Sequence, residues 1–246
     1  MTGSNSKYFE NNLRLDGRRE TDLRALRCRM CVFDDHAARV DGSAYVEMGL
    51  TKVIASVLGP RERQGGAASF KPVTVEYSMA TFSTSERKKK LRQDRRNKEV
   101  SLALEKVFEV AIMTNLFASS QISIHVEVLQ SDGGAKCAAI NAITLALIDA
   151  GIPMYDYVTS CSVGCIDNRL ILDLNFLEEC SRGAVVPVAI FPASERVLLL
   201  QLEQKLPLQK LEEAMQLSLK GCLAVHKVLH EAVKQHATDL LVKRGI

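Results

Sequence analysis

The residues best placed to do chemistry lie in a Gly-Gly turn near the middle of the chain. Residues 122–128 alternate apolar and polar side chains, which predicts a half-buried strand, and Gly133 and Gly134 follow it. The nearly all-apolar run 138–150 then predicts a helix that is buried on most sides. A strand that passes through glycines into a helix N-terminus presents unpaired backbone N–H groups and the positive end of the helix dipole, so phosphate is a candidate ligand. A tight turn without a ligand explains the same glycines.

A second candidate is the densest positive stretch of the chain. Residues 86–98, ERKKKLRQDRRNK, hold eight Lys or Arg against two acids, whereas the whole chain has a formal net charge of only +3. Arg61 and Arg63 add charge in an earlier loop, and Arg95 and Arg96 lie inside the basic run. Such a run forms either a solvated loop or a contact with a phosphate backbone. With no tryptophan and few aromatic residues, backbone electrostatics rather than base stacking would have to carry nucleic-acid binding.

Two pairs of residues have the spacing of metal ligands, but neither pair belongs to a complete set of ligands. Cys28 and Cys31 have a zinc-like spacing, but no second pair stands at ligand spacing, and an offset of three in a strand puts the thiols on opposite faces. His226 and His230 have the i, i+4 spacing of a helical zinc pair, yet Lys227 stands where a metalloprotease needs Glu. We therefore expect no metal site and two solvent-facing histidines.

The cysteine number and the hydropathy of the chain indicate the compartment in which it resides. The chain has seven cysteines, an odd and scattered number that favours free thiols in a reducing compartment over a disulfide framework. It has no apolar run of about 18 or more residues and no basic-then-apolar leader. We expect an intracellular protein with no membrane partner.

The remaining patterns predict the elements that must position these residues. Strands are expected near 25–33, 43–48, 52–58, 72–78, 157–165, 169–174, 185–191 and 196–202, with helices near 97–116 and from Pro207 onward. Asp41-Gly42 and Gly59-Pro60 are turn signals, and residues 64–71 are expected to form a flexible loop. Because the strands come in groups with helices between them, the sequence favours an α+β fold with helices packed on sheets.

Many short motifs occur in the order found in the RNase PH family, which the chain resembles from about Leu13 to the final helix. They are Leu15-Asp16-Gly17-Arg18-Arg19, Asp41-Gly42-Ser43-Ala44, Gly59-Pro60-Arg61-Glu62, Phe82-Ser83-Thr84 with Glu86-Arg87, Asp94-Arg95-Arg96, residues 129–134, Ala150-Gly151-Ile152-Pro153-Met154, Ser160-Cys161-Ser162 and Leu172-Asp173-Leu174-Asn175. The resemblance implies an α+β fold of the RNase PH-like, ribosomal protein S5 domain 2-like type. It also implies a flexible tail over 1–12 and one domain over 13–246, with a core to about 153 and a C-terminal subdomain over 154–246.

The same resemblance implies site residues. Active relatives use inorganic phosphate to attack the last phosphodiester at an RNA 3′ end. The matching phosphate-binding positions are Gly133, Gly134, Ala135 and Lys136, and the matching catalytic acidic positions are Asp173 and Glu179. Active relatives carry Ser or Thr and then Arg where this chain has Ala135 and Lys136, and Asp at 179. Losing one preorganised donor costs about 10² to 10³ in rate, so these changes together predict little phosphorolysis.

We therefore expect a non-catalytic, RNA-binding ring subunit of the RNA exosome, with Arg95, Arg96, Arg61 and Arg63 as RNA-binding residues. The resemblance implies single-stranded RNA, other RNase PH-like subunits in a hexameric ring, RNA-binding cap subunits and a hydrolytic exoribonuclease as partners. It also implies a location in nucleus, nucleolus and cytoplasm. No cofactor is expected, and phosphate and Mg²⁺ enter only if the site is active. The alternatives are an active phosphate-dependent 3′ to 5′ exoribonuclease and a small-molecule phosphotransferase.

Overall fold

The computed structural model describes residues 9–10, 13–33, 40–62, 71–84, 87, 94–117, 120–181 and 183–244. Arg63, nearly all of the expected loop over 64–71, and the expected tail over 1–12 apart from residues 9–10 lie outside this part of the chain.

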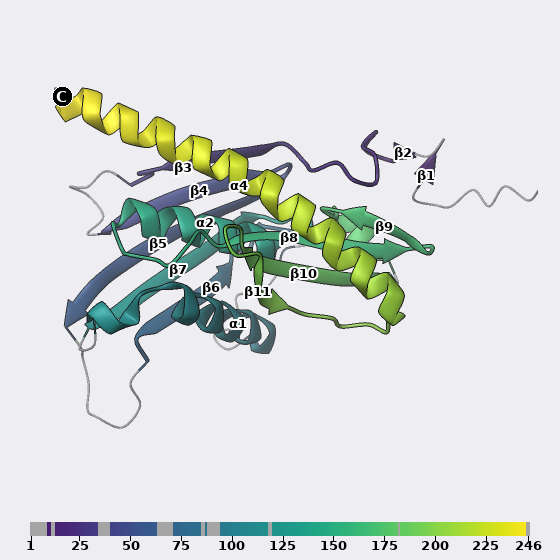
Figure 1. The fold of residues 1–246 in the computed structure, drawn as a ribbon, viewed down its shortest axis with the longest axis horizontal. Coiled ribbons are helices and arrows are strands. Elements are labelled where there is room, and N and C mark those ends of the chain that lie inside the picture. The colour runs from purple at the N-terminus through teal and green to yellow at the C-terminus, as the bar shows by residue number, and fades with distance from the viewer. Residues whose placement is uncertain are drawn as a thin grey trace, which may run out of the picture.

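Two main sheets form the protein (Figure 1). The first has five strands in the order β3-β4-β5-β7-β6, where only the β6–β7 pair is parallel. Its strands are β3 (Leu26–Met30), β4 (Gly42–Met48), β5 (Thr51–Glu62), β6 (Val73–Met79) and β7 (Ser120–Gln130). The second has four antiparallel strands in the order β11-β10-β8-β9. These are β8 (Thr159–Ile166), β9 (Arg169–Leu172), β10 (Ala184–Phe191) and β11 (Arg196–Leu200).

Helices cover these sheets, so the α+β prediction is confirmed. They are α1 (Arg95–Ala111), α2 (Ala135–Asp149), α3 (Phe176–Glu179) and α4 (Leu208–Arg244), and a 3-10 turn spans Thr114–Phe117. The short strands β1 (Phe9–Glu10) and β2 (Leu13–Arg14) pair with each other. The predicted strands and helices correspond to these elements, but β1, β2 and α3 have no counterpart in the sequence prediction.

Helix α2 is the layer shared by both sheets. It contacts β4 and β5 of the first sheet and β8 of the second. All residues from Cys137 to Leu147 are buried, which explains why its sequence is apolar on every side. The N-terminus of α2, which carries the Gly-Gly turn, is thereby fixed between the two sheets.

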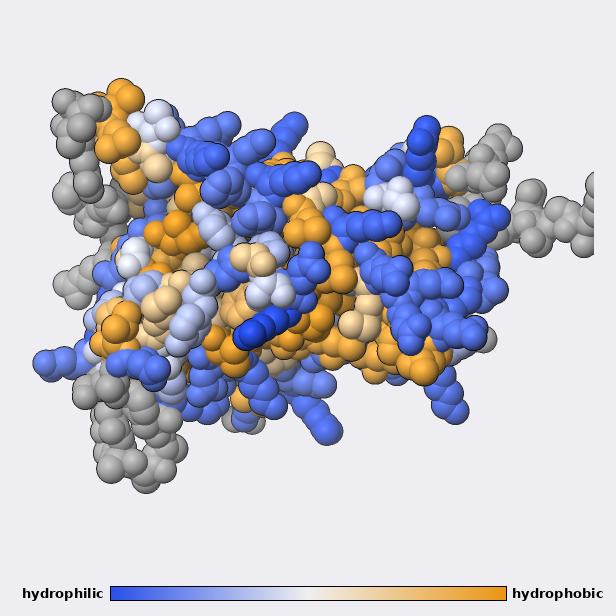
Figure 2. Space-filling model, in the orientation of Figure 1, coloured by the Kyte–Doolittle hydropathy of each residue, from blue (hydrophilic) through white to orange (hydrophobic). Residues whose placement is uncertain are grey.

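Helix α4 runs over the second sheet and past it (Figure 1). Its buried face includes Ala214, Cys222, Val225 and Leu229. Hydrophobic side chains remain exposed toward its C-terminal end, where Val242 is 70% exposed (Figure 2). No helix in the described ranges is long and apolar enough to cross a membrane.

Two local expectations are wrong. The helix expected to reach residue 116 ends at Ala111, because Ile112 is extended and bridges to Met154. The expected turn at Gly59-Pro60 lies inside β5, at a register shift in its pairing with β7. The continuous β5 consequently carries Arg61 to the end of the sheet at which β7 begins.

Helix α1 covers the free edge of β6. The backbone N–H of Tyr77 donates to Ser101 Oγ at 3.0 Å, and that of Val75 donates to Glu105 Oε1 at 3.4 Å. Side chains of α1 therefore take the place of a further strand, which protects this edge from pairing with another chain.

A buried amide joins α2 to β8. Asn141 Nδ2 donates to the carbonyl of Ser160 at 3.1 Å, and Asn141 Oδ1 accepts from the Ser160 N–H at 2.9 Å. Strand β9 pairs with β8 only from Val163 onward, so Asn141 supplies the hydrogen bonds that a neighbouring strand would make at Ser160.

We predict that Asn141→Leu, which leaves two buried backbone groups unsatisfied, lowers the free energy of unfolding by about 2–4 kcal/mol. Denaturant unfolding measures the change. The matched control is Asn115→Leu on the exposed 3-10 turn, for which a change within about 0.5 kcal/mol is expected. Equal effects of the two substitutions would contradict the structural role of Asn141.

Candidate functional site

A cavity of about 1020 Å³ lies between α1, β6, the N-terminus of α2 and the segment after β11. Its lining brings together groups from several separate parts of the chain. They include Tyr77, Arg96, Gly134, Ala135, Lys136, Ser162, Glu179 and Glu203. Several of the residues predicted to form a site therefore do share one cavity.

The Gly-Gly turn has the geometry that the sequence predicted. Gly133 and Gly134 have φ angles of 81° and 64°, in the left-handed region that favours glycine. A Cβ at Gly133 would lie 2.6 Å from the backbone carbon of Asn175, so a side chain cannot be accommodated there. Gly134 is the N-cap of α2 and supplies no side-chain cap. Its N–H donates to Glu179 Oε2 at 3.3 Å.

Asp173, the first predicted catalytic acid, does not line the cavity. Its side chain is 1% exposed and binds Arg24 through both carboxylate oxygens. Arg24 Nη2 lies 2.7 Å from Oδ1, Arg24 Nε lies 3.0 Å from Oδ2, and the Arg24 backbone N–H also donates to Oδ2 at 2.9 Å. A bidentate ion pair of this kind is strong and directional, and it occupies both oxygens of the carboxylate inside the protein.

The same guanidinium grips the Gly-Gly turn. Arg24 Nη1 donates to the carbonyl of Asp132 at 2.7 Å, and Nη2 donates to that of Gly133 at 3.3 Å. Burial by itself lowers the pKa of Arg24, but the hydrogen bond and charge of Asp173 and the charge of Asp132 outweigh it and raise that pKa. The sequence analysis missed Arg24, because no motif or spacing separates it from the other arginines of the chain.

A second buried arginine holds the acidic segment. Arg14 Nε donates to Glu178 Oε1 at 2.8 Å, Nη2 donates to Glu178 Oε2, and Nη1 donates to the carbonyl of Leu172 at 2.7 Å. Asn175 caps α3 through a reciprocal capping box with Glu178. Residues 172–179 are thus fixed from both ends, and this fixes the place of Glu179.

Glu179, the second predicted acid, lies on the exposed side of that segment and lines the cavity. Its partner is the turn, whereas Asp173 binds Arg24. In the described ranges, no group of three or more His, Cys, Asp or Glu side chains could hold a metal. A Mg²⁺ ion at this position would therefore have to compete with Arg24 and the turn for the two carboxylates.

The predicted cations are dispersed. Lys136 Nζ lies 3.1 Å from Gln201 Oε1 and 3.6 Å from Glu203 Oε1, so it faces the segment after β11. Arg96 lines the cavity at the start of α1, where Asp94 caps the helix through the Arg96 N–H. Arg95, its neighbour, is exposed but does not line the cavity.

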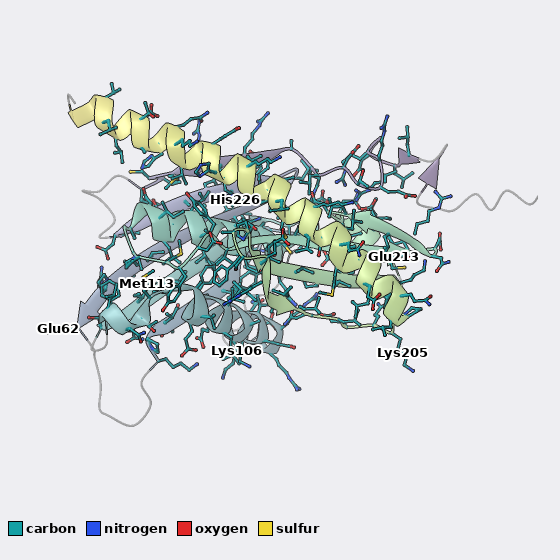
Figure 3. All side chains as sticks on the ribbon, in the orientation of Figure 1. Glu62, Lys106, Met113, Lys205, Glu213 and His226 are labelled. Atoms are coloured by element: carbon teal, nitrogen blue, oxygen red, sulfur yellow. The ribbon has the colours of Figure 1, made fainter. Side chains whose placement is uncertain are left out.

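Arg61 does not line the cavity. It pairs with Asp41 at 3.7 Å and stands opposite Gln121, at the start of β7, whereas the Gly-Gly turn follows the end of that strand. In Figure 3, Glu62, the neighbour of Arg61, lies at the opposite end of the molecule from Lys205. Arg63 lies outside the described residues.

The predicted solvent-facing histidines are partly enclosed. His226 and His230 stack with their ring centroids 5.8 Å apart, and Tyr157 contacts both edge-on. Burial, with a smaller contribution from His230, lowers the pKa of His226. The prediction that they face solvent is wrong, because α4 turns this side toward Tyr157. Neither Cys28 nor Cys31 forms a disulfide with another cysteine of the described residues.

The two sheets, the shared helix and the turn facing an acidic segment define a class of protein. Residues 22–153 match the 3′ exoribonuclease family, domain 1, and residues 156–221 match domain 2 of that family. The chain belongs to this family, which is the RNase PH family, so the RNase PH-like fold and the resemblance are confirmed.

Its relatives include named exosome proteins. The chain is 43% identical over 240 residues to exosome complex component RRP41 of Bos taurus, covering 96% of each chain. It is 41% identical over 229 residues to exosome complex component Rrp41 of Thermococcus kodakarensis, covering 92% of this chain and 90% of the relative. The crystal structure of rice Rrp46 superposes with a TM-score of 0.78 at 22% identity, covering 90% of this chain and all of that one. That likeness shows the shared fold.

We predict that Asp173→Asn destabilises the fold, because the buried Arg24 guanidinium loses the counter-ion that binds it through two oxygens and keeps only Asp132, at 3.9 Å. Breaking a buried pair in this way costs about 3–5 kcal/mol. Denaturant unfolding at neutral pH measures the loss. The control is Asp167→Asn at an exposed turn position, which should change stability by less than about 0.5 kcal/mol. A stable Asp173→Asn protein would show that the pair is dispensable.

Proposed function

We propose that this chain is a non-catalytic, RNA-binding ring subunit of an RNA exosome. Membership of the 3′ exoribonuclease family and about 40% identity to exosome components from animals and archaea support this assignment. The observation that carries the loss of catalysis is that the groups matching the phosphorolytic site bind other parts of the chain. Asp173 binds Arg24, Lys136 binds Gln201 and Glu203, and Glu179 binds the turn.

Phosphorolysis needs a bound phosphate, a gripped RNA end and a way to stabilise the leaving oxygen. Ala135 offers no hydroxyl beside the turn, and Lys136 replaces a two-pronged guanidinium with a single charge that already has partners. Glu179 keeps the charge of the Asp found in active relatives, but its longer side chain places the carboxylate on the Gly134 N–H, one of the donors that would hold phosphate. All three differences from active relatives weaken the binding of phosphate, so the requirement for a bound phosphate is not met.

RNA contact remains available. Arg96 is exposed and lines the cavity together with Tyr77, which pairs with Val126 of β7, whereas Arg61 pairs with Gln121, about 17 Å earlier along that strand. Two separated basic points suit an extended single strand, which can reach both, better than they suit a compact ligand. This role needs no reaction, because backbone charge gives affinity without sequence preference.

Assembly completes the proposal. Strand β11 is an edge strand on which Val197 and Leu200 are 40% and 41% exposed, and another RNase PH-like subunit in a hexameric ring would cover such an edge. Cap subunits that bind RNA and a hydrolytic exoribonuclease are the further partners, in nucleus, nucleolus and cytoplasm. In this assembly the subunit shapes the channel that leads RNA to the nuclease, and no cofactor is needed.

One observation favours the alternative of an active, phosphate-dependent exoribonuclease. Arg96, Lys136 and Glu179 line one cavity. A cation that could bind RNA, a cation that could bind phosphate and a carboxylate therefore share the same space. The exoribonuclease family gives no comparable support to a small-molecule phosphotransferase.

We predict that the reconstituted ring releases no nucleoside diphosphates from RNA in the presence of phosphate. The combined change Ala135→Ser, Lys136→Arg and Glu179→Asp should restore measurable release, whereas each single change should do little, because such groups act as a unit. Chromatography of the products with and without phosphate measures this. Diphosphates from the unmodified ring that disappear without phosphate would refute the proposal and establish the active alternative.

A second prediction concerns RNA affinity. Replacing Arg95 and Arg96 with Glu should weaken binding of all RNA sequences about equally and reduce the slope of log affinity against log salt by about one to two units. The matched control is Lys106→Glu, on the same helix and exposed but not lining the cavity, which should leave the slope unchanged. Fluorescence anisotropy across a salt series measures both. Equal slopes in the three proteins would mean that this end of α1 only faces solvent.

A further inference from the structure

Phe82 is an aromatic side chain that the fold leaves in solvent. It is 70% exposed, the largest exposed fraction among the aromatic side chains whose burial the structure describes. Single apolar residues on a surface are common and need no explanation by themselves. The position of Phe82 is less ordinary, because Thr81 before it and Thr84 two residues after it line the cavity, whereas Phe82 does not. The phenyl ring therefore stands at the margin of the cavity rather than inside it.

The turn that carries Phe82 is fixed on both sides. The Ala80 N–H donates to the Val128 carbonyl at 3.0 Å, and the Ser83 N–H donates to the Ala80 carbonyl at 3.0 Å. The Ser131 N–H donates in turn to the Ser83 carbonyl at 2.8 Å, and both Ala80 and Ser83 are buried. The backbone of Phe82 is thus held against the end of β7. Because a ligand would have to order only its side chain, contact with Phe82 costs little conformational entropy.

Two cations of the same cavity are open to a ligand. Arg96 and Lys98 lie in the first turn of α1, are exposed and line the cavity. The other two cations of the described lining, Lys71 and Lys136, are paired with carboxylates. The start of α1 is therefore the part of the cavity where a phosphate group finds a positive charge most readily.

A nucleotide of a single strand has the two features that this margin of the cavity would recognise. Its phosphate is an anion for Arg96 and Lys98, and its base is a flat ring that stacks on an aromatic side chain. Stacking tolerates any base, because every base has an aromatic face. An apolar side chain of a protein partner would cover Phe82 but would leave the two cations without a counter-charge. The combination of ring and cations favours RNA as the occupant.

We propose that Phe82 stacks on one base of a single-stranded RNA whose backbone contacts Arg96 and Lys98. The inference rests on the proposed function and extends it, since backbone charge alone provides the RNA affinity in that proposal. Aromatic residues make up only 5% of the chain, so one stacked base adds to the electrostatic attraction and does not replace it. The contribution of Phe82 should be insensitive to salt, unlike that of the cations.

The test measures binding of a fluorescent oligouridine to the reconstituted ring, by anisotropy across a salt series. Phe82→Ala should weaken binding by about fivefold or more and leave the slope of log affinity against log salt unchanged. Phe82→Trp should retain the affinity, because indole offers a larger aromatic face. The matched control is Tyr155→Ala, which removes an aromatic side chain that is 59% exposed and has no cavity-lining neighbour in the sequence. This control should leave the affinity unchanged.

A strand without bases separates stacking from other effects. The same rings are titrated with an RNA of equal length and charge whose riboses are abasic, and Phe82→Ala should then bind as tightly as the unmodified ring. Light scattering of each ring establishes that the variants assemble.

Three outcomes would overturn the inference. They are equal affinity of Phe82→Ala and the unmodified ring for oligouridine, an equal loss of affinity for the abasic strand, and failure of Phe82→Ala to assemble, which would place Phe82 at a contact with another subunit. An unmodified ring that binds no oligouridine would instead refute the RNA-binding role itself, and this inference with it. Failure of the proposed function is therefore distinguishable from failure of the stacking contact alone.

Discussion

The buried ion pair between Arg24 and Asp173 is the interaction on which the site depends. Arg24 comes from the segment before β3, and Asp173 from the turn after β9, 149 residues later in the chain. The same guanidinium reaches two carbonyls of the Gly-Gly turn. One side chain thus fixes the relative position of both family domains and of the turn that faces the cavity. A buried pair is tolerable only when its hydrogen bonds are satisfied, and here both carboxylate oxygens have donors.

The pair works together with α2, which both sheets bury. Because α2 is apolar on every side, its position is set by packing, but packing alone does not orient the turn at its start. Arg24 does that from one side, and close contact of Gly133 with Asn175 does it from the other. The position of the turn beside the cavity therefore depends on how the two family domains pack together.

Much of this could be predicted from the sequence, and what could not has physical causes. Residues 122–128 alternate with period two and residues 138–150 are nearly all apolar, so the strand, turn and helix around the glycines were predictable. Helix α3 has four residues, too few for any period. The partners of Asp173 and Lys136 lie far away in the sequence, and one sequence gives no distance between them. The resemblance gave the positions of the acidic pair, but the direction that each carboxylate faces depends on arginines that no pattern marks.

The direction that each side chain faces determines whether its identity is evidence about catalytic activity. Because Asp173 is engaged by Arg24 and buried, a carboxylate at this position is needed for the fold whether or not the protein has a reaction to catalyse. Its presence therefore does not support activity. Ala135, Lys136 and Glu179 lie on the cavity side, where the fold places weaker demands on the side chain. The proposed loss of catalysis rests on the chemistry at these three positions.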